Sequence, residues 1–230
     1  MDPAPLNDDC AKTATQGFSR RHVTAGALAT AGVWVAPSVL KLDRVAAAVP
    51  SQPYIPFYTE DFQGAIGAPG ATWSMVPTDV APADPNRRFL GQFNNDTVTL
   101  SISGLPPHDC LCVEFDFYAI QSWDGNNPGT GPDRLNVLID GVNEFSETFA
   151  HPGQTAGQTF GPDPTFNPAQ TGAVETGTLG YSFFSDSVYR LSICDLVHTS
   201  STATITFSVA GLQGINDESW GLDNLEVSYV

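Results

Sequence analysis

The sequence predicts an all-β protein, a two-sheet antiparallel β-sandwich that follows a cleavable N-terminal signal segment. Short runs rich in Val, Thr, Ile, Phe and Tyr recur along residues 49–230, and clusters of Gly, Pro and Asn separate them. No stretch in this range has the apolar spacing of an amphipathic helix. About nine or ten short strands with turns at such spacings favour a sandwich over a barrel or a propeller.

Alternation of apolar and polar residues defines the clearest strands. In residues 97–103, Val98, Leu100 and Ile102 face the core while Thr and Ser face out, because side chains two apart share a face. Asp140-Gly141 is a hairpin signal between two further strands. We expect strands at residues 57–62, 88–93, 97–103, 111–120, 134–139, 142–149, 188–196, 203–209 and 222–229.

The strand at residues 111–120 has two different faces. One face is apolar and belongs to the core, and it carries Val113, Phe115, Phe117 and Ala119. The other face is wet or lines a groove, and it carries Cys112, Glu114, Asp116 and Tyr118.

Two connections are too long for the strand rhythm, residues 121–133 and 150–185. Long connections in compact domains are usually functional or disordered. The second contains Phe160, Phe166, Phe184 and other aromatic residues. These rings either pin the loop as a small cluster or form a platform for a flat ligand such as a sugar ring.

Residues 1–48 resemble a twin-arginine signal peptide. Arg20 and Arg21 precede a mildly apolar segment that is rich in Ala and Gly, and the small residues 46–48 are of the kind that export peptidases accept. The apolar segment is too weak for a convincing membrane anchor, although a retained helix is the alternative. We therefore expect the twin-arginine export machinery as a partner and an extracytoplasmic location, secreted, periplasmic or at the cell surface.

Residues 49–230 are long enough for one β-sandwich domain with a sizeable core. The whole chain has a formal net charge of −16, and five of its nine basic residues lie in the predicted signal peptide. So acidic a surface repels phosphate backbones and anionic lipid, which excludes nucleic acid as a partner and the membrane after cleavage. The same surface is suited to cation binding.

Three cysteines remain after the expected cleavage, Cys110, Cys112 and Cys194, an odd number for an oxidising compartment. Cys194 lies on a different predicted strand from the other two and could reach either. We expect one disulfide, with Cys112 and Cys194 as its candidate partners, in preference to a metal site.

The chain ends with the motif W-G-L-D-N-L-E-V at residues 220–227. This motif resembles the last strand of jelly-roll β-sandwiches of the carbohydrate-binding-module and laminin-G-like (concanavalin-like) kind. Residues 89–93, 95–98, 122–126 and 211–214 are also similar to stretches of secreted bacterial proteins of that shape. The resemblance implies a jelly roll in which a structural calcium ion often joins the first strand to the last.

Glu60 and Asp61 on the first strand and Asp223 on the last are the donors that such a calcium site would use, since calcium takes oxygen ligands. Alternation places Asp223 on the same face as Leu225 and Val227, so its carboxylate needs a partner. That partner is either a calcium ion or backbone N–H groups at a strand corner.

A second group of residues has the composition of a metal or ligand loop: Asp124, Asn126 and Asp133, together with Asp217 and Glu218. These residue types also form turns, which is the alternative. Trp123, Trp220 and Tyr181 are candidate aromatic residues for stacking against a ligand, and burial in the core is their alternative role.

Catalytic motifs are absent from the sequence, with no nucleophile elbow, zincin motif or P-loop. The predicted function is therefore an exported, non-catalytic, calcium-stabilised β-sandwich that binds glycan or another cell-surface component. One alternative is a structural envelope or matrix protein with no small ligand. Another is a glycoside-active enzyme that uses Glu114, Asp116 or Glu218.

Overall fold

A computed structural model describes residues 53–181 and 184–230, and these residues form strands, turns and loops without a helix. Among the described residues, no helix is long and apolar enough to cross a membrane. The predicted signal peptide, with Arg20 and Arg21, and its boundary at residue 48 lie outside the described residues.

The strands of the described chain follow the predicted order with small shifts at their ends. They are β1 (Ile55–Glu60), β2 (Ala71–Trp73), β3 (Thr78–Val80), β4 (Arg88–Phe93), β5 (Thr97–Ser103), β6 (Cys110–Gln121), β7 (Arg134–Ile139), β8 (Val142–Thr148), β9 (Glu175–Thr176), β10 (Ser187–Val197), β11 (Thr202–Ala210) and β12 (Glu218–Tyr229). The short strands β2, β3 and β9 were not predicted, because two or three residues are too few to show an alternating pattern.

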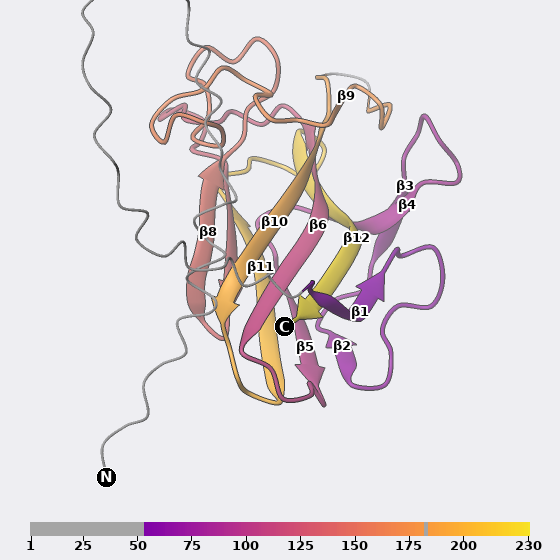
Figure 1. The fold of residues 1–230 in the computed structure, drawn as a ribbon. Helices are drawn as coiled ribbons and strands as arrows, with labels where there is room; N and C mark the ends of the chain where they lie inside the picture. The colour runs from indigo at the N-terminus through magenta and orange to yellow at the C-terminus, as the bar shows by residue number, and fades with distance from the viewer. Residues whose placement is uncertain (1–52, 182–183) are drawn as a thin grey trace, which may run out of the picture.

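Two antiparallel sheets form the sandwich, as predicted (Figure 1). The larger sheet has the order β3-β4-β12-β6-β10-β9, with β1 also paired to β12, and the smaller sheet has the order β2-β5-β11-β7-β8. The hairpin between β7 and β8 turns at Asp140 and Gly141, whose φ angles of 49° and 82° suit a tight turn of this kind.

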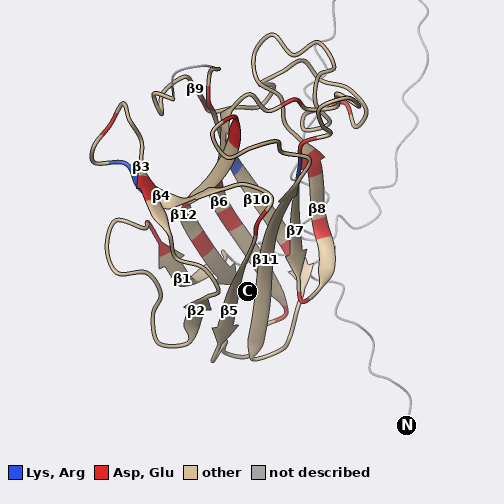
Figure 2. Cartoon of the chain, turned by 180° about the vertical axis from the view of Figure 1, so that it is seen from behind, with Lys and Arg blue, Asp and Glu red and all other residues tan. Residues whose placement is uncertain are grey.

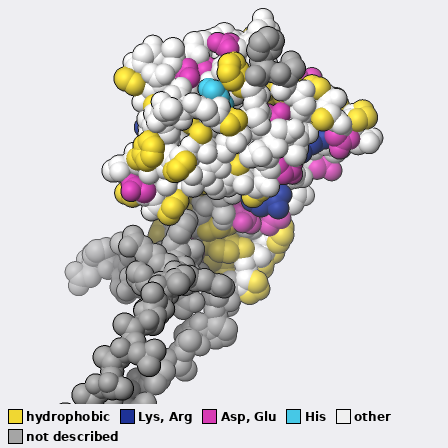
Figure 3. All heavy atoms as spheres, turned by 90° about the horizontal axis from the view of Figure 1, so that it is seen from above, with side chains coloured by type: hydrophobic (Ala, Val, Ile, Leu, Met, Phe, Trp, Pro, Cys, Tyr) yellow, Lys and Arg dark blue, Asp and Glu magenta, His cyan; other side chains and the backbone are white. Residues whose placement is uncertain are grey.

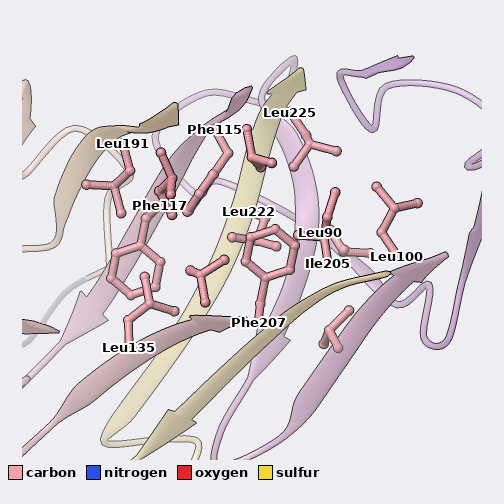
Figure 4. Close-up of a cluster of buried hydrophobic side chains, with 14 of the residues drawn as sticks. Leu90, Leu100, Phe115, Phe117, Leu135, Leu191, Ile205, Phe207, Leu222 and Leu225 are labelled. Carbon is pink, nitrogen blue, oxygen red and sulfur yellow. The ribbon is translucent and has the colours of Figure 1, made fainter. Parts of the chain in front are cut away.

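The core lies between the sheets. Its residues come from alternate positions of facing strands, among them Phe115 and Phe117 on β6, Ile205 and Phe207 on β11, and Leu222 on β12 (Figure 4). The outward positions of β5 and β11 carry no charged residue, whereas acidic side chains are spread over the larger sheet, β8 and the loops (Figure 2). A disulfide joins Cys112 on β6 to Cys194 on the neighbouring strand β10.

A bulge in β12 corrects the predicted orientation of Asp223. Asn224 has a φ of 49°, and the register between β12 and β6 shifts between Asp223 and Glu226. Leu222 and Leu225 therefore both reach the core, while Asp223 faces outward with Tyr118. The prediction that Asp223 shares a face with Leu225 was wrong, because strict alternation fails where one extra residue is inserted.

The long connection at residues 150–185 is tied down at several points. Phe160 packs against Phe149 and Tyr189, with ring centroids 5.0 and 5.4 Å apart. The Asp186 carboxylate accepts backbone N–H groups from Leu179 and Gly180. Phe160 thus pins part of this connection to the main core of the sandwich, and not within a small cluster of the connection's own.

Candidate metal centre

Three carboxylates gather at the end of the sandwich where the long loops lie. Asp124 and Asp133 belong to the loop after β6, and Glu218 is the first residue of β12, paired with Gln121 at the end of β6. One oxygen from each of the three carboxylates lies within 4.8 Å of the other two. The pairing of β6 with β12 thus brings residues far apart in sequence to one point.

Two of these carboxylates are buried without a full set of partners. Asp133 and Glu218 are both 0% exposed, and Asp133 Oδ1 and Glu218 Oε1 accept no hydrogen bond. Glu218 Oε2 accepts the Gln213 N–H at 2.7 Å, and Asp133 Oδ2 accepts the Asp124 N–H. A buried polar atom without a partner costs roughly 1–3 kcal/mol, and more when it is charged.

The electrostatics of the cluster are one-sided. Burial raises the pKa of Asp133 to about 7, and the charge of Asp124 adds to this effect. Burial also raises the pKa of Glu218 to about 8, with further contributions from Asp133, Asp124 and Asp217. Every charged group that contributes to these two shifts is an acid, so the cluster lacks a cation among the described residues.

Two glycines allow the loop after β6 and the connection before β12 to pack closely around Asp133. Gly125 has a φ of 61°, and its carbonyl oxygen accepts the Asp133 N–H at 3.0 Å. Gly211 has a φ of 106°, and a Cβ there would collide with the Pro132 carbonyl oxygen and lie 3.0 Å from Asp133 Oδ1. A larger residue at either position would be strained, since L-residues with a side chain rarely adopt a positive φ.

The remaining members of the predicted loop group support the three carboxylates. Asp217 accepts the Ser122 hydroxyl at 2.8 Å, which ties the start of one loop to the end of the other. Asn126 Oδ1 accepts the Thr148 hydroxyl at 2.6 Å. Asp124 Oδ1 accepts the Gln154 side-chain amide at 2.7 Å. The sequence predicted the group from its composition, and the structure divides it into clustered carboxylates and bracing residues.

The donor set fits a hard divalent cation. It consists of carboxylate oxygens, with no sulfur or nitrogen ligand in the group. Calcium takes six to eight such oxygens and tolerates irregular geometry, whereas magnesium demands a near-ideal octahedron. The two buried oxygens without hydrogen-bond donors are the ones that a cation would satisfy.

The first and last strands are paired, as the other predicted calcium site requires, and its three acids have the following surroundings. Glu60 Oε2 accepts the Tyr58 hydroxyl at 2.8 Å and the Gly67 N–H at 2.9 Å. Asp223 Oδ2 accepts the Tyr118 hydroxyl at 2.7 Å, on the outer face of the sheet. Asp61 is exposed. Among the described residues, no cluster of metal-ligating atoms includes any of these three acids.

Both candidate tryptophans lie in the core, which corrects their predicted role as stacking platforms. Trp123 and Trp220 are 1% and 0% exposed. Their indole N–H groups donate to the carbonyl oxygens of Ser219 and Asn94, at 2.8 and 2.6 Å. The third candidate, Tyr181, is partly buried, and its hydroxyl donates to Asp79 at 2.9 Å. Tryptophan is large and apolar enough that burial outweighs exposure at both positions.

Two other aromatic rings flank the carboxylate cluster and are open to solvent. Phe166 is 51% exposed and lies against Gly157, whose carbonyl oxygen accepts the Asn126 N–H at 2.8 Å. Phe184 is 38% exposed, and its ring lies 4.7 Å from the ring of His151. We call Phe166, Phe184 and His151 the aromatic rim. Figure 3 shows this end of the molecule, where hydrophobic, acidic and histidine side chains share one face.

The candidate catalytic acids do not form an accessible pair. Asp116 is 3% exposed, and Arg190 donates to its two oxygens at 2.8 and 2.9 Å. Glu114 is exposed on the same strand, and Glu218 is buried in the carboxylate cluster. A glycosidase needs two carboxyl groups that flank the bond to be cleaved. An ion-paired acid beside an exposed one on a single strand face does not provide this arrangement.

No protein-family model matches the chain, and no curated protein matches it. Solved structures with a similar shape include a carbohydrate-binding module that recognises mannan, with 14% identity and a TM-score of 0.42 over 78% of this chain and 99% of the module. A family 35 carbohydrate-binding module from Clostridium thermocellum has 10% identity and a TM-score of 0.33, over 74% of this chain and 98% of the module.

A third similar structure is a family GH115 4-O-methyl-alpha-glucuronidase with specificity for decorated arabinogalactans, with 14% identity and a TM-score of 0.39. The match covers 82% of this chain but 20% of that protein, so the chain spans about a fifth of its length. At such identities and TM-scores, we take no functional argument from any of these structures.

Proposed function

We propose that this protein is an exported, non-catalytic β-sandwich that calcium stabilises and that binds a glycan or another cell-surface component at its loop end. The observation that carries the proposal is the cluster of Asp124, Asp133 and Glu218, in which two buried carboxylate oxygens have no hydrogen-bond donor. Export rests on the twin-arginine pattern of the sequence.

Calcium at this cluster would stabilise the arrangement of three segments. The loop after β6 supplies Asp124 and Asp133, and the start of β12 supplies Glu218. Gln213, in the connection before β12, holds the other oxygen of Glu218. An ion that binds only the folded state stabilises it by mass action. The ion would thus fix the loop after β6, against which the connection that carries the aromatic rim is held by hydrogen bonds between Asn126 and Gly157 and between His151 and Trp123.

The aromatic rim supplies the chemistry for a sugar. Phe166 and Phe184 offer exposed apolar rings beside the loop that carries Asp124, where a sugar ring could stack. The net charge of −16 disfavours polyanions, so we propose a neutral polysaccharide as the glycan. The aromatic rim is therefore the surface that we propose for contact with a neutral polysaccharide.

Thermal unfolding tests the metal part of the proposal. The purified protein is stripped with a chelator and titrated with calcium or magnesium, and we expect calcium to raise the melting temperature more. Asp133→Asn and Glu218→Gln should abolish that rise. Asp61→Asn is the matched control, since Asp61 belongs to the other predicted site and is exposed. Equal melting temperatures with and without calcium would refute the metal site.

Affinity electrophoresis in gels that contain mannan, xylan or β-glucan tests the binding part. Retardation by one of these polymers, lost in Phe166→Ala and Phe184→Ala, is the expected result. Val142→Ala is the control, because Val142 is 60% exposed and lies at the other end of the sandwich. If no neutral polysaccharide retards the protein and it sediments with insoluble envelope fractions, the structural alternative replaces glycan binding.

A further inference from the structure

Two buried histidines meet an aspartate at the end of the sandwich opposite the carboxylate cluster. His108 lies in the connection between β5 and β6, His198 follows β10, and Asp140 is in the turn between β7 and β8. His108 and His198 are 9% and 8% exposed, and their rings stack with centroids 5.0 Å apart. The three side chains therefore join three separate connections.

A continuous line of hydrogen bonds runs through these side chains. His108 Nδ1 lies 2.6 Å from the Pro106 carbonyl oxygen, and His108 Nε2 lies 2.7 Å from His198 Nδ1. His198 Nε2 lies 3.1 Å from Asp140 Oδ2. All four ring nitrogens thus take part in a contact of hydrogen-bond length.

The three hydrogen bonds of this line need three protons. The Pro106 oxygen can only accept, so His108 Nδ1 carries a proton and donates it. The contact between the two rings needs a second proton, and the contact between His198 and Asp140 needs a third. Two neutral imidazoles supply only two protons. A hydrogen bond in each of the three contacts therefore requires one proton more than two neutral histidines carry.

Asp140 is the less suitable place for the third proton. Its side chain is 43% exposed, and Asp140 Oδ1 accepts the Thr204 N–H at 2.8 Å, which favours the ionised carboxylate. We propose that His108 and His198 together bind one proton as a shared imidazolium, ion-paired to Asp140, and that this proton operates as a pH-sensitive clamp on three connections of the fold.

The groups around the pair favour a bound positive charge. Glu144 and Asp195 line a hollow of about 300 Å³ together with Asp140 and His198, and no basic side chain lines it. Tyr229 of β12 approaches the His108 ring at 6.0 Å, edge to face. Asp109 follows His108, and its carbonyl oxygen accepts the His198 N–H at 3.0 Å. The neighbours are thus acidic, phenolic or aliphatic.

Loss of the proton changes the contacts directly. Without it, two nitrogen lone pairs, or a nitrogen and a carboxylate oxygen, face each other at 2.7 or 3.1 Å. One ring must then turn or move away. The clamp is accordingly closed at low pH and released as the pH rises through the range in which histidine titrates.

Nuclear magnetic resonance of the ring nitrogens in the full chain tests this proposal, with calcium held constant and in excess. We expect the His108–His198 pair to carry three ring protons at low pH and to lose one as the pH rises, while His108 Nδ1 remains protonated. Comparison with His151→Gln identifies the resonances of the histidine at the other end. Only two ring protons on the pair at low pH would overturn the proposal.

Substitution of the counter-ion gives a second measurement. Asp140→Asn keeps a residue type that tolerates the φ of 49°. It should lower the pH at which the pair loses its proton, because the opposite charge is removed. Glu144→Gln removes a charge from the same hollow without touching either histidine, and a smaller shift is expected. Equal titrations in Asp140→Asn and the unmodified protein would count against the clamp.

Discussion

The two ends of the sandwich differ in whether their buried ionisable side chains have hydrogen-bond partners and an opposite charge. At the loop end, Asp133 and Glu218 are buried beside a third acid, and one oxygen of each has no donor. At the opposite end, His108 and His198 are buried, but each ring nitrogen has a partner and Asp140 supplies the opposite charge. The histidine end has a partner for each buried nitrogen, whereas the loop end has two unpaired oxygens that the proposed calcium ion would satisfy.

The contrast has a structural origin. Short connections supply the histidine end, where backbone bonds such as Val230 N–H to the Cys110 carbonyl oxygen hold the elements together. The loop end is built from long, Gly-rich connections that have few regular partners of their own. The proposed calcium ion would supply cross-links between these connections.

Removal of calcium should produce the largest change. At a calcium concentration about a thousand times the dissociation constant, a site that exists only in the folded state stabilises it by about 4 kcal/mol. Chelation should therefore lower the free energy of unfolding by this amount, measured by urea denaturation. The Asp133→Asn variant should show no response. A similar response in that variant would locate the calcium elsewhere.

The metal-free protein should lose stability as the pH rises. The pKa values of Asp133 and Glu218 are raised to about 7 and about 8, from ordinary values of 3.8 and 4.5, so the folded state holds protons that the unfolded chain releases. The resulting stability is complete below the ordinary values and is lost as the pH rises through 7 and 8. We expect the free energy of unfolding to fall between the two extremes, by about 1.4 kcal/mol for each unit by which a pKa is raised in the folded state.

Calcium should suppress this pH dependence, because the bound ion replaces the protons. Urea denaturation between acid and mildly alkaline pH, with and without calcium, checks both statements. A metal-free protein whose stability increases over this range would show that the two carboxyl groups are not buried as described.

Gly211→Ala should destabilise the loop end by about 2 kcal/mol, because a Cβ at this positive φ meets the Pro132 carbonyl oxygen. Gly141→Ala is the matched change at the histidine end, where φ is 82° and no atom lies within 4 Å of the added Cβ. Thermal unfolding and calcium titration of both variants separate backbone strain from crowding. Calcium affinity should fall in Gly211→Ala alone, and an equal fall in both would contradict the crowding at Asp133.

Tyr118→Phe should have the smallest effect, about 1 kcal/mol, because it removes the hydroxyl that donates to the buried carboxylate of Asp223. Burial raises the pKa of Asp223 to about 6, and the Tyr118 hydrogen bond opposes that rise. The variant creates a buried acid with fewer partners, as at Asp133, but without neighbouring metal ligands. Equilibrium unfolding measures the loss of stability. If calcium stabilised this variant more than the unmodified protein, a single buried carboxylate without a donor would be enough to bind calcium.

Sequence patterns were most reliable where structure depends on near neighbours. The alternation in residues 97–103 predicts β5 with its bounds, and Asp140-Gly141 predicts the β7–β8 hairpin. The mixture of Asp, Asn and Gly near residue 124 predicts either turns or a ligand loop, and residues 122–133 form the connection between β6 and β7. In each case the signal is a side-chain period or a backbone preference that acts over a few residues.

Contacts between distant segments were beyond the reach of those patterns. The bulge at Asn224 reverses the orientation of Asp223, and the depth of Trp123 and Trp220 in the core depends on both sheets. The meeting of His108 with His198 has no local signal at all, since ninety positions separate the two residues.

The sequence by itself therefore determined the strand order, most strand faces and the acidic composition of the loops. Only the tertiary structure decided which acids share a point and which histidines share a proton. The pairing of β6 with β12 brings Glu218 to Asp124 and Asp133, and the packing of three connections brings His198 to His108 and Asp140. The physical reason is that a buried charge is defined by everything that surrounds it, and those surroundings come from distant parts of the chain.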